Sequence, residues 1–309
     1  MTKRILITGA AGYIGHQLGN RLAEHYPVIG TDIRSRPDVA FDIRVQDIRE
    51  PSLTDLLQAQ QITHVVHLAS ILQASPDRAR DYDIDVNGTR NVLECCIKAG
   101  VQHFTVTSSG AAYGYHADNP AWIDEQDALR GNTEFAYSDH KRLIEEMLAD
   151  YRQQHPELQQ LIFRPGTVLG TDTRNQITNL FMAPRILALK GSDSPFVFIW
   201  DQDVIGAMEM GIREDKTGIF NMAGDGALTM AEIARRLNKP LLTLPVWLVK
   251  AGLQVAKWRG KPTGPEQVNF LRYRPVLSNR RLKEEFGYPL AKTSAETFEY
   301  FVEANGLRR

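Results

Sequence analysis

Lys3-Arg4-Ile5-Leu6-Ile7-Thr8-Gly9-Ala10-Ala11-Gly12-Tyr13-Ile14-Gly15 is the stretch that decides the fold. In it a short apolar run is followed by three regularly spaced glycines, and helical periodicity begins at Ile14. A strand, a turn and a helix in this order are the context in which such glycines bind the pyrophosphate of a dinucleotide. We therefore predict a phosphate-binding turn at the start of the chain.

The three glycines have different expected roles in this turn. Gly9 permits the tight turn, Gly12 lets the backbone approach phosphate oxygens, and Gly15 lets the helix lie close to the strand. Tyr13 and Ile14 begin the helix, where unpaired N–H groups would face the same anion. The alternative is a glycine-rich turn that binds nothing.

The composition is that of an ordinary globular protein. Of 309 residues, 43% are hydrophobic and 24% are charged, which suits one large domain or one domain with a smaller cap. The net charge is -1 with both signs interspersed, so we expect a small-molecule partner, and neither nucleic acid nor a membrane. The two cysteines are adjacent, at Cys95 and Cys96, which predicts a reducing compartment without a disulfide framework or a zinc site.

The hydropathy and the first residues favour a cytoplasmic location. Met1 leads almost directly into the first expected strand, which leaves no room for a signal peptide. No apolar run reaches the ~18 residues of a membrane span. The histidines lack metal-ligand spacing, so we expect no metal.

Apolar strands alternate with amphipathic helices over the first half of the chain, which is typical of a parallel sheet covered on both faces. We predict an α/β fold, a Rossmann-type doubly wound parallel sheet with a smaller C-terminal α/β substrate cap. Residues 1–170 would form the cofactor-binding domain, and residues 171–309 mainly the cap, partly interleaved with the sheet. The expected strands are 5–8, 27–32, 64–68, 103–108, 161–164 and, in the cap, 196–200. The expected helices are 14–25, 52–59, 85–99, 137–155 and 203–212.

The second expected strand ends at Asp32, near the usual spacing from the glycine turn. An acidic residue there binds the ribose hydroxyls of adenosine, so Asp32 favours NAD. Arg34 and Arg36 are close enough to keep NADP as the alternative. Asp47 and Ile48 follow the next strand region, and Asp47 is either an acceptor beside the adenine or an ordinary loop residue.

Tyr137-Ser138-Asp139-His140-Lys141 contains the pattern Tyr-x-x-x-Lys. Its spacing places the phenol and the ammonium one turn apart on one helix face. A free phenol ionises near pH ~10, so a tyrosine base needs a neighbouring cation. Because this pair also occurs by chance on solvated helices, it indicates a catalytic site only together with a third element.

Ser108 and Ser109 supply that element at the end of an expected strand. Ligands of a doubly wound sheet bind at the carboxyl ends of its strands, so both hydroxyls would point into the cofactor crevice. Ser109 is the candidate substrate contact and Ser108 a cofactor contact. Alternatively, the serines only cap the strand end or the next turn.

Seven motifs in order make the chain resemble the extended short-chain dehydrogenase/reductase family, the NAD-dependent epimerase/dehydratases. They are Thr-Gly-x-x-Gly-x-x-Gly at 8–15, Asp32, His-Leu-Ala-Ser at 67–70, Asn-Gly-Thr-Arg-Asn at 87–91, Ser108-Ser109 ahead of Tyr113-Gly114, Tyr137 with Lys141, and Arg-Pro-Gly at 164–166. The resemblance is strong to about Gly170 and continues more weakly in 220–224 and 279–288.

The resemblance implies specific roles for the site residues. Tyr137 would be the acid/base that exchanges a proton with the substrate, while Lys141 would hold the nicotinamide ribose and stabilise the phenolate. Ser109 would polarise the reacting oxygen, and Asn87 would support the catalytic site. Further cofactor contacts would come from Leu68, Ala69, Ser70, Pro165, Gly166 and Val168. A homodimer paired through helices 85–99 and 137–155 is also implied, although their apolar faces could equally cover the sheet.

Two departures from the family narrow the expected reaction. Related 4,6-dehydratases carry an Asp-Glu pair directly after the catalytic hydroxyl, where this chain has Gly110 and Ala111, so dehydration by that mechanism is not expected. Pro195 and Phe196 replace a polar segment that contacts a nucleotide, which leaves the nucleotide-sugar substrate open. The candidate substrate contacts besides Ser109 are Gln73, Arg272 and Arg274, the arginines as a clamp on a diphosphate.

Two further features have ordinary interpretations. Residues 245–258 have the pattern of an apolar helix with lysines on one side, which we expect to pack in the cap. A substrate lid or a membrane-surface helix is the alternative. His140 faces away from Tyr137 and Lys141 at helical pitch, so we expect it at the surface.

Three functions are compatible with these observations. The first is an epimerase that keeps NAD bound and acts on a sugar or sugar nucleotide. The second is an NAD(P)-dependent dehydrogenase or carbonyl reductase for a smaller or more apolar substrate. The third is a nonenzymatic NAD-binding sensor, which would have no need of Ser109, Tyr137 and Lys141 together.

Overall fold

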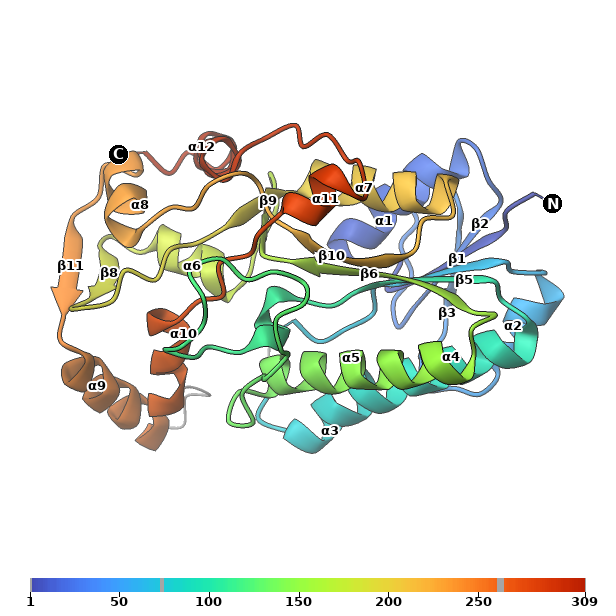
Figure 1. The fold of residues 1–309 in the computed structure, drawn as a ribbon, viewed down its shortest axis with the longest axis horizontal. Coiled ribbons are helices and arrows are strands. Elements are labelled where there is room, and N and C mark those ends of the chain that lie inside the picture. Colours follow the sequence, from blue (N-terminus) through green and yellow to red (C-terminus); the bar gives the residue numbers. More distant parts are fainter. Residues whose placement is uncertain (1, 73–74, 260–263, 309) are drawn as a thin grey trace.

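A seven-stranded parallel sheet forms the centre of the computed structural model, which describes residues 2–72, 75–259 and 264–308 (Figure 1). The strand order is β3-β2-β1-β4-β5-β6-β10, and every pairing in it is parallel. The bounds are β1 (Ile5–Thr8), β2 (Val28–Asp32), β3 (Asp42–Val45), β4 (His64–His67), β5 (His103–Thr107), β6 (Gln159–Pro165) and β10 (Gly218–Met222). The predicted Rossmann-type doubly wound fold is confirmed.

Helices cover both faces of this sheet. One layer is made by α2 (Leu53–Ala59), α3 (Arg78–Tyr82), the π-helix η1 (Asp83–Asn87), α4 (Gly88–Ala99) and α5 (Ala136–Gln154). The other layer is made by α1 (Tyr13–Ala23), α7 (Asp201–Arg213) and α11 (Arg280–Glu284). Within β1, Leu6 belongs to the first core and its neighbours Ile5 and Ile7 to the second, because successive strand residues point to opposite faces.

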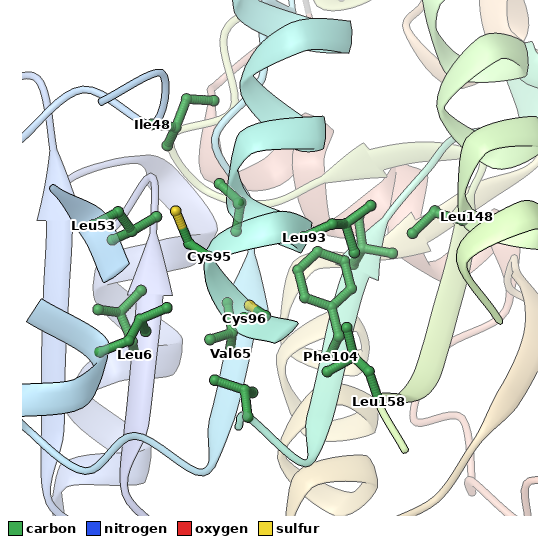
Figure 2. Close-up of a cluster of buried hydrophobic side chains, with 14 of the residues drawn as sticks. Leu6, Ile48, Leu53, Val65, Leu93, Cys95, Cys96, Phe104, Leu148 and Leu158 are labelled. Carbon is green, nitrogen blue, oxygen red and sulfur yellow. The ribbon is translucent and has the colours of Figure 1, made fainter. Parts of the chain in front are cut away.

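Figure 2 shows the core beneath α4, where Leu93 and Cys96 meet Val65 and Phe104 of the adjacent strands. Fully burying side chains of this size contributes roughly 1.5–3 kcal/mol each, which holds the helix layer on the sheet. Cys95 and Cys96 are both free thiols in this core, and burial raises the pKa of the Cys96 thiol. Both cysteines therefore act as small apolar side chains.

The cap is built from two small parallel sheets and short helices. Its strands are β7 (Thr167–Leu169) with β9 (Phe198–Trp200), and β8 (Ile186–Leu189) with β11 (Leu241–Leu244). Its helices are α6 (Gln176–Met182), α8 (Met230–Arg236), α9 (Val246–Trp258), the 3-10 turn η3 (Pro265–Gln267), α10 (Val268–Arg272) and α12 (Ser294–Ala304). The 3-10 turn η2 (Gly110–Tyr113) follows β5. A cluster of phenylalanines fills the cap core, with the rings of Phe181 and Phe298 5.2 Å apart.

The C-terminal half contributes more to the sheet than the sequence indicated. β10 was not among the expected strands, yet it pairs with β6 and closes that edge of the sheet. α7 lies in the same helix layer as α1, with buried residues of both in one core. A boundary at residue 170 therefore separates β10 and α7 from the strand and the helix that they pack against, as the expected interleaving of the cap with the sheet implies.

Candidate active site

A cavity of about 850 Å³ lies along the carboxyl ends of the sheet strands. It passes the point where β1 is flanked by β2 on one side and β4 on the other, which is where open α/β sheets bind ligands. One end is formed by the glycine turn and Asp32, and the other by Arg274. The lining residues come from both halves of the chain.

The glycine turn has a backbone that only glycine fits. Gly9 has φ +70°, and a Cβ there would lie 2.7 Å from the Ala69 nitrogen. A Cβ on Gly15 would collide with the Gly9 carbonyl oxygen. No side chain caps α1 and its first turn has no acid, so its N–H groups and positive dipole end favour an anion at Gly12 and Ile14.

Tyr13 connects this turn to the C-terminal half. Its hydroxyl donates a hydrogen bond to Asp201 Oδ2 at 2.6 Å, and Asp201 begins α7. Burial, followed by the hydrogen bond to this carboxylate, raises the pKa of Tyr13 to about 12. The phenol therefore keeps its proton and fixes α1 against α7 beside the cavity.

Asp32 lies at the end of β2 and lines the cavity. Its carboxylate accepts hydrogen bonds from the main-chain nitrogens of Ala11 at 3.0 Å and Arg34 at 3.2 Å. Arg34 also lines the cavity, whereas Arg36 is outside the lining set and pairs with Asp38 at 3.1 Å. Arg34 is therefore in a position to meet a 2'-phosphate in this cavity, and Arg36 is not.

Asp47 and Ile48 also line the cavity. The Asp47 carboxylate is already engaged by Arg49, with a shortest contact of 2.6 Å, and these hydrogen bonds hold the pKa of Asp47 below its usual value. Ile48 is part of the core under α4. An adenine beside Asp47 would thus meet an ion pair and an apolar side chain.

Tyr137 and Lys141 reach the same cavity from the first two turns of α5. Lys141 Nζ lies 5.7 Å from the centre of the Tyr137 ring and donates to the Thr107 carbonyl oxygen at 3.2 Å. Ser138, between them, donates to the Ala111 oxygen at 2.6 Å and so anchors the helix start to η2. A cation and a helix N-terminus both stabilise negative charge on a phenol at this position.

Ser108 and Ser109 follow β5 and complete this group. Ser109 Oγ accepts from the Ala111 nitrogen at 3.1 Å, which leaves its hydroxyl hydrogen free to donate into the cavity. Ser108 Oγ is buried without a hydrogen-bond partner. A buried hydroxyl that lines a cavity and lacks a partner suits a ligand that supplies one.

The other predicted cofactor contacts also line the cavity: Leu68, Ala69, Ser70, Pro165, Gly166 and Val168. Gly110 and Ala111, which stand where an acid pair would serve dehydration, line it too. The side chains at those two positions cannot transfer a proton. The glycine cradle, the open helix end and the unpartnered Ser108 hydroxyl together fit a dinucleotide.

His67 lies beneath the turn, at the end of β4, and carries no charge. Burial, followed by the nearby charge of Lys141, lowers the pKa of His67 to about 3. Its Nδ1 lies 2.8 Å from Thr8 Oγ1 and its Nε2 3.0 Å from Thr89 Oγ1. Because the Thr89 hydroxyl donates to the main-chain oxygen of Asp85, we assign the ring proton to Nε2. The ring joins β1, β4 and α4.

Asp85 is a buried site residue that the sequence analysis did not single out. Its Oδ1 accepts from Ser70 Oγ at 3.1 Å and from the Ile71 nitrogen at 2.8 Å. Its Oδ2 lies 3.1 Å from His140 Nδ1. One carboxylate therefore joins the cofactor-lining loop after β4 to the helix that carries Tyr137.

Two expectations need correction here. His140 is buried, not at the surface, because η1 brings Asp85 against the side of α5 that faces away from Lys141. Asn87 is outside the cavity lining, and its exposed side chain donates to Asp83 at 2.9 Å. Asn87 is two positions after Asp85, and in η1 the acid faces α5 and the loop after β4 while the amide faces outward.

Arg274 is a buried cation at the substrate end of the cavity. Its guanidinium donates to the Ser194 oxygen at 2.7 Å and stacks on Phe196 at 3.9 Å, while its Nε has no partner. Burial lowers the pKa of Arg274 to about 9. Arg272 is not in the cavity lining and lies over the Tyr273 ring. Gln73 is outside the described residues.

An aromatic wall faces Arg274, and sequence reasoning did not find it. Tyr115 and Phe270 have ring centres 5.3 Å apart, Phe135 is 5.7 Å from Tyr115, and all three line the cavity. Pro195 and Phe196 line the same end. Nothing in the local pattern marks Tyr115, Phe135 and Phe270, because they come from three separate segments of the chain.

No metal site accompanies this arrangement in 2–72, 75–259 and 264–308, where no cluster of three or more His, Cys, Asp or Glu side chains is suited to an ion. In the same ranges, no helix has the length and hydropathy needed to cross a bilayer.

Comparison with known proteins identifies the class that this fold and site define. The model of the NAD dependent epimerase/dehydratase family matches residues 5–202. The chain belongs to this family, whose members include the extended short-chain dehydrogenase/reductase enzymes.

Three similar proteins illustrate this placement. An uncharacterized Mycobacterium tuberculosis protein is 24% identical over 99% of this chain and 85% of its own. The Escherichia coli enzyme N-acetyl-alpha-D-glucosaminyl-diphospho-ditrans,octacis-undecaprenol 4-epimerase is 28% identical over 58% of this chain and 53% of its own. The Bordetella bronchiseptica enzyme WbmG, crystallised with NAD and UDP, has a TM-score of 0.76 at 19% identity and covers 100% of this chain and 96% of its own.

Proposed function

We propose that this protein is an NAD-dependent enzyme that moves a hydride at a hydroxyl or carbonyl carbon of a sugar linked to a diphosphate. The observation that carries the proposal is the single cavity that joins the glycine turn and Asp32 to Ser109, Tyr137 and Lys141. A nonenzymatic sensor would need the first part of this cavity and not the second.

The protein's groups would move one proton around the reacting oxygen. During oxidation, the phenolate of Tyr137 would take the hydroxyl proton of the substrate. NAD, which the glycine turn and Asp32 would hold, would supply the hydride-accepting chemistry. Lys141 and the start of α5 stabilise the phenolate. The Ser109 hydroxyl donates to the same oxygen and stabilises the charge that develops on it. Return of the hydride to the opposite face of the carbonyl carbon would give the epimer.

NAD is the proposed cofactor, with NADP as the alternative. NAD is present in structures similar to this chain, including the Bordetella enzyme. The placement of Asp32 and the engagement of Arg36 with Asp38 support a cofactor without a 2'-phosphate.

The substrate class is supported by Arg274. A buried guanidinium without an acidic partner is costly unless a ligand supplies the anion, and a diphosphate does so with bidentate geometry. The Bordetella structure contains UDP, and the name of the Escherichia coli enzyme specifies a polyprenyl diphosphate. The chemistry that the two share is a diphosphate ester.

A second candidate is a dehydrogenase or carbonyl reductase for a substrate without a nucleotide. Pro195, Phe196 and the wall of Tyr115, Phe135 and Phe270 favour it, because they make the substrate end of the cavity apolar. In such an enzyme, Arg274 would bind an anion simpler than a diphosphate.

The test uses purified protein with NAD and two sets of substrates, UDP-sugars and polyprenyl-diphosphate sugars. Epimerisation gives a new sugar isomer without net NADH, whereas a dehydrogenase gives stoichiometric NADH. We expect Tyr137→Phe to abolish either product while NAD binding, followed by calorimetry, is retained. Full turnover by Tyr137→Phe would refute the catalytic assignment, and a 4-keto-6-deoxy sugar product would indicate dehydration instead.

The proposal also includes a cytoplasmic homodimer paired through α4 and α5. Light scattering of the full chain at several concentrations tests the pairing. A mass equal to one chain across the range would remove the dimer from the proposal.

A further inference from the structure

Helix α9 (Val246–Trp258) packs through one face and leaves the other open. Val246, Val249 and Leu253 lie in a small apolar core with residues of β8, β11 and α10. The opposite side presents Trp247 and Trp258, whose side chains are 69% and 77% exposed. Leu248 and Val255 are exposed on the same side of the helix. A packed cap helix would instead have a polar outer face.

The exposed apolar groups of the described chain concentrate here. Of the large hydrophobic side chains that are exposed in those residues, five lie in β11 and α9: Leu241, Trp247, Leu248, Val255 and Trp258. The others are spread over six separate positions. Concentration of this kind marks an interaction surface, whereas single exposed hydrophobics are ordinary.

The charge of this segment has one sign only. Residues 239–265 contain no Asp or Glu, and they contain Lys239, Lys250, Lys257, Arg259 and Lys261. The sequence of this segment therefore has a net positive charge, and its exposed cations include Lys250 and Arg259. Tryptophan with lysine and arginine on one amphipathic helix is the composition of helices that lie in the interface of an anionic bilayer.

The position of α9 suits such a surface. It lies at the end of the molecule away from the N-terminus, outside the sheet and its helix layers (Figure 1). Val268 and Leu271 of α10 pack in the same small core as Val249, and Phe270 between them lines the cavity. One short helix thus separates α9 from the substrate end of the cavity.

We propose that α9 docks the protein onto a membrane surface that contains anionic lipid, with Trp247 and Trp258 inserted among the lipid headgroups. A second copy of the chain fits this surface less well, because a two-fold pair would set the cations of one α9 against the same cations of the other. The docking is peripheral, since α9 has 13 residues and spans only ~20 Å. It revises the expectation that the protein has no membrane partner.

The experiment is flotation of the full-length protein with vesicles of phosphatidylcholine alone or with phosphatidylglycerol, in the absence of cofactor and substrate. We expect binding to the anionic vesicles, a blue shift of tryptophan fluorescence on binding, and loss of binding at high salt. Trp247→Ser with Trp258→Ser should weaken binding by about tenfold or more. Both side chains are mainly in water, so this double variant should keep its Tm and NAD affinity.

Trp122→Ser is the matched control, because Trp122 is a half-exposed tryptophan outside this segment. It should bind vesicles like the unchanged protein. Absence of binding to anionic vesicles would overturn the proposal, and so would equal binding by the double variant and the control. A dimer that dissociates only in the double variant, without vesicle binding, would assign the surface to a second copy. None of these readouts depends on catalysis, so the proposed function stands or falls separately.

Discussion

His140 Nδ1 lies 3.1 Å from Asp85 Oδ2, and this contact joins α5, which carries Tyr137, to the loop after β4 that lines the cavity. Both residues are almost completely buried. The same carboxylate accepts from Ser70 and Ile71, so this one side chain links that loop to the helix of Tyr137. Asp85 is a positioning residue, since it acts on the site through its neighbours.

Asp85→Asn keeps the shape of this side chain and removes one acceptor atom. Either His140 or the Ser70 and Ile71 donors must then face an amide NH2, so we expect a loss of unfolding free energy of about 1–3 kcal/mol. NAD affinity should fall as well. Urea unfolding measures the loss of stability, and calorimetry measures the loss of NAD affinity. Asp150→Asn, at an exposed position of α5 outside the cavity lining, is the control and should leave both unchanged. Equal behaviour of the two variants would contradict the positioning role.

The stability of the protein in acid should depend on the same carboxylate. Burial alone would raise the pKa of Asp85, but hydrogen bonds from His140 and Ile71 and the charge of Lys141 outweigh it and hold that pKa below 3.8. The stabilisation is therefore complete above the unfolded value and is lost as the pH falls through the lower native value. Asp85→Asn should show a shallower loss of unfolding free energy between pH ~5 and pH ~2. An unchanged slope would mean that other carboxylates dominate.

Asp32→Asn should weaken NAD binding and reduce the preference over NADP. The variant loses a charged acceptor for the ribose hydroxyls, which corresponds to about a 10- to 100-fold lower affinity. Dissociation constants for both cofactors give the measurement. Asp55→Asn removes an exposed carboxylate of α2 outside the cavity lining and should change neither constant. Unchanged NAD affinity in Asp32→Asn would place the adenosine elsewhere.

Arg274→Met should make the protein more stable and less able to bind a diphosphate. Among the described residues no acid pairs with this buried guanidinium, so an apolar side chain of similar length removes a costly buried charge. We expect a higher Tm together with a loss of UDP affinity of about tenfold or more. Arg272→Met, two residues away and outside the cavity lining, should leave UDP affinity unchanged. A lower Tm with intact UDP binding would show that Arg274 is structural.

Gly9→Ala tests the turn. A side chain at φ +70° costs about 1–2 kcal/mol, and a Cβ there would also meet the Ala69 nitrogen at 2.7 Å. Gly191→Ala has a similar φ of +76° with nothing within 4 Å, so it reports the backbone cost alone. The difference in unfolding free energy between the two variants measures the close packing of the turn. NAD binding should disappear only in Gly9→Ala, and its persistence would separate the turn from the cofactor.

Local patterns explain why the first half of the fold could be predicted. β1, the turn and α1 follow from an apolar run, glycine spacing and helical periodicity within a few residues of each other. β10 was missed because Gly218 opens a short run whose pairing partner, β6, lies far away in the sequence. Its place in the sheet is set by that long-range pairing and by the core under α7.

The candidate site, too, could be predicted only where the sequence pattern is local. Spacing was sufficient to place Tyr137 and Lys141 together, because both belong to one helix. Helical pitch also placed His140 on the other side, but pitch cannot tell whether that side meets water or another element. The π-helix η1 covers it, and the register of η1 decides that Asp85 and not Asn87 faces inward.

The order of strands in the sheet determines when this protein can fold. β6 is complete at Pro165, but its free edge is covered only when β10 is present, more than fifty residues later in the chain. During synthesis, a chain that has reached the cap still exposes a row of unpaired peptide groups on β6. Such an edge recruits other strands and promotes aggregation. A fragment of residues 1–170 would present this exposed edge of β6, so we expect it to be a poor starting point for engineering a cofactor-binding protein.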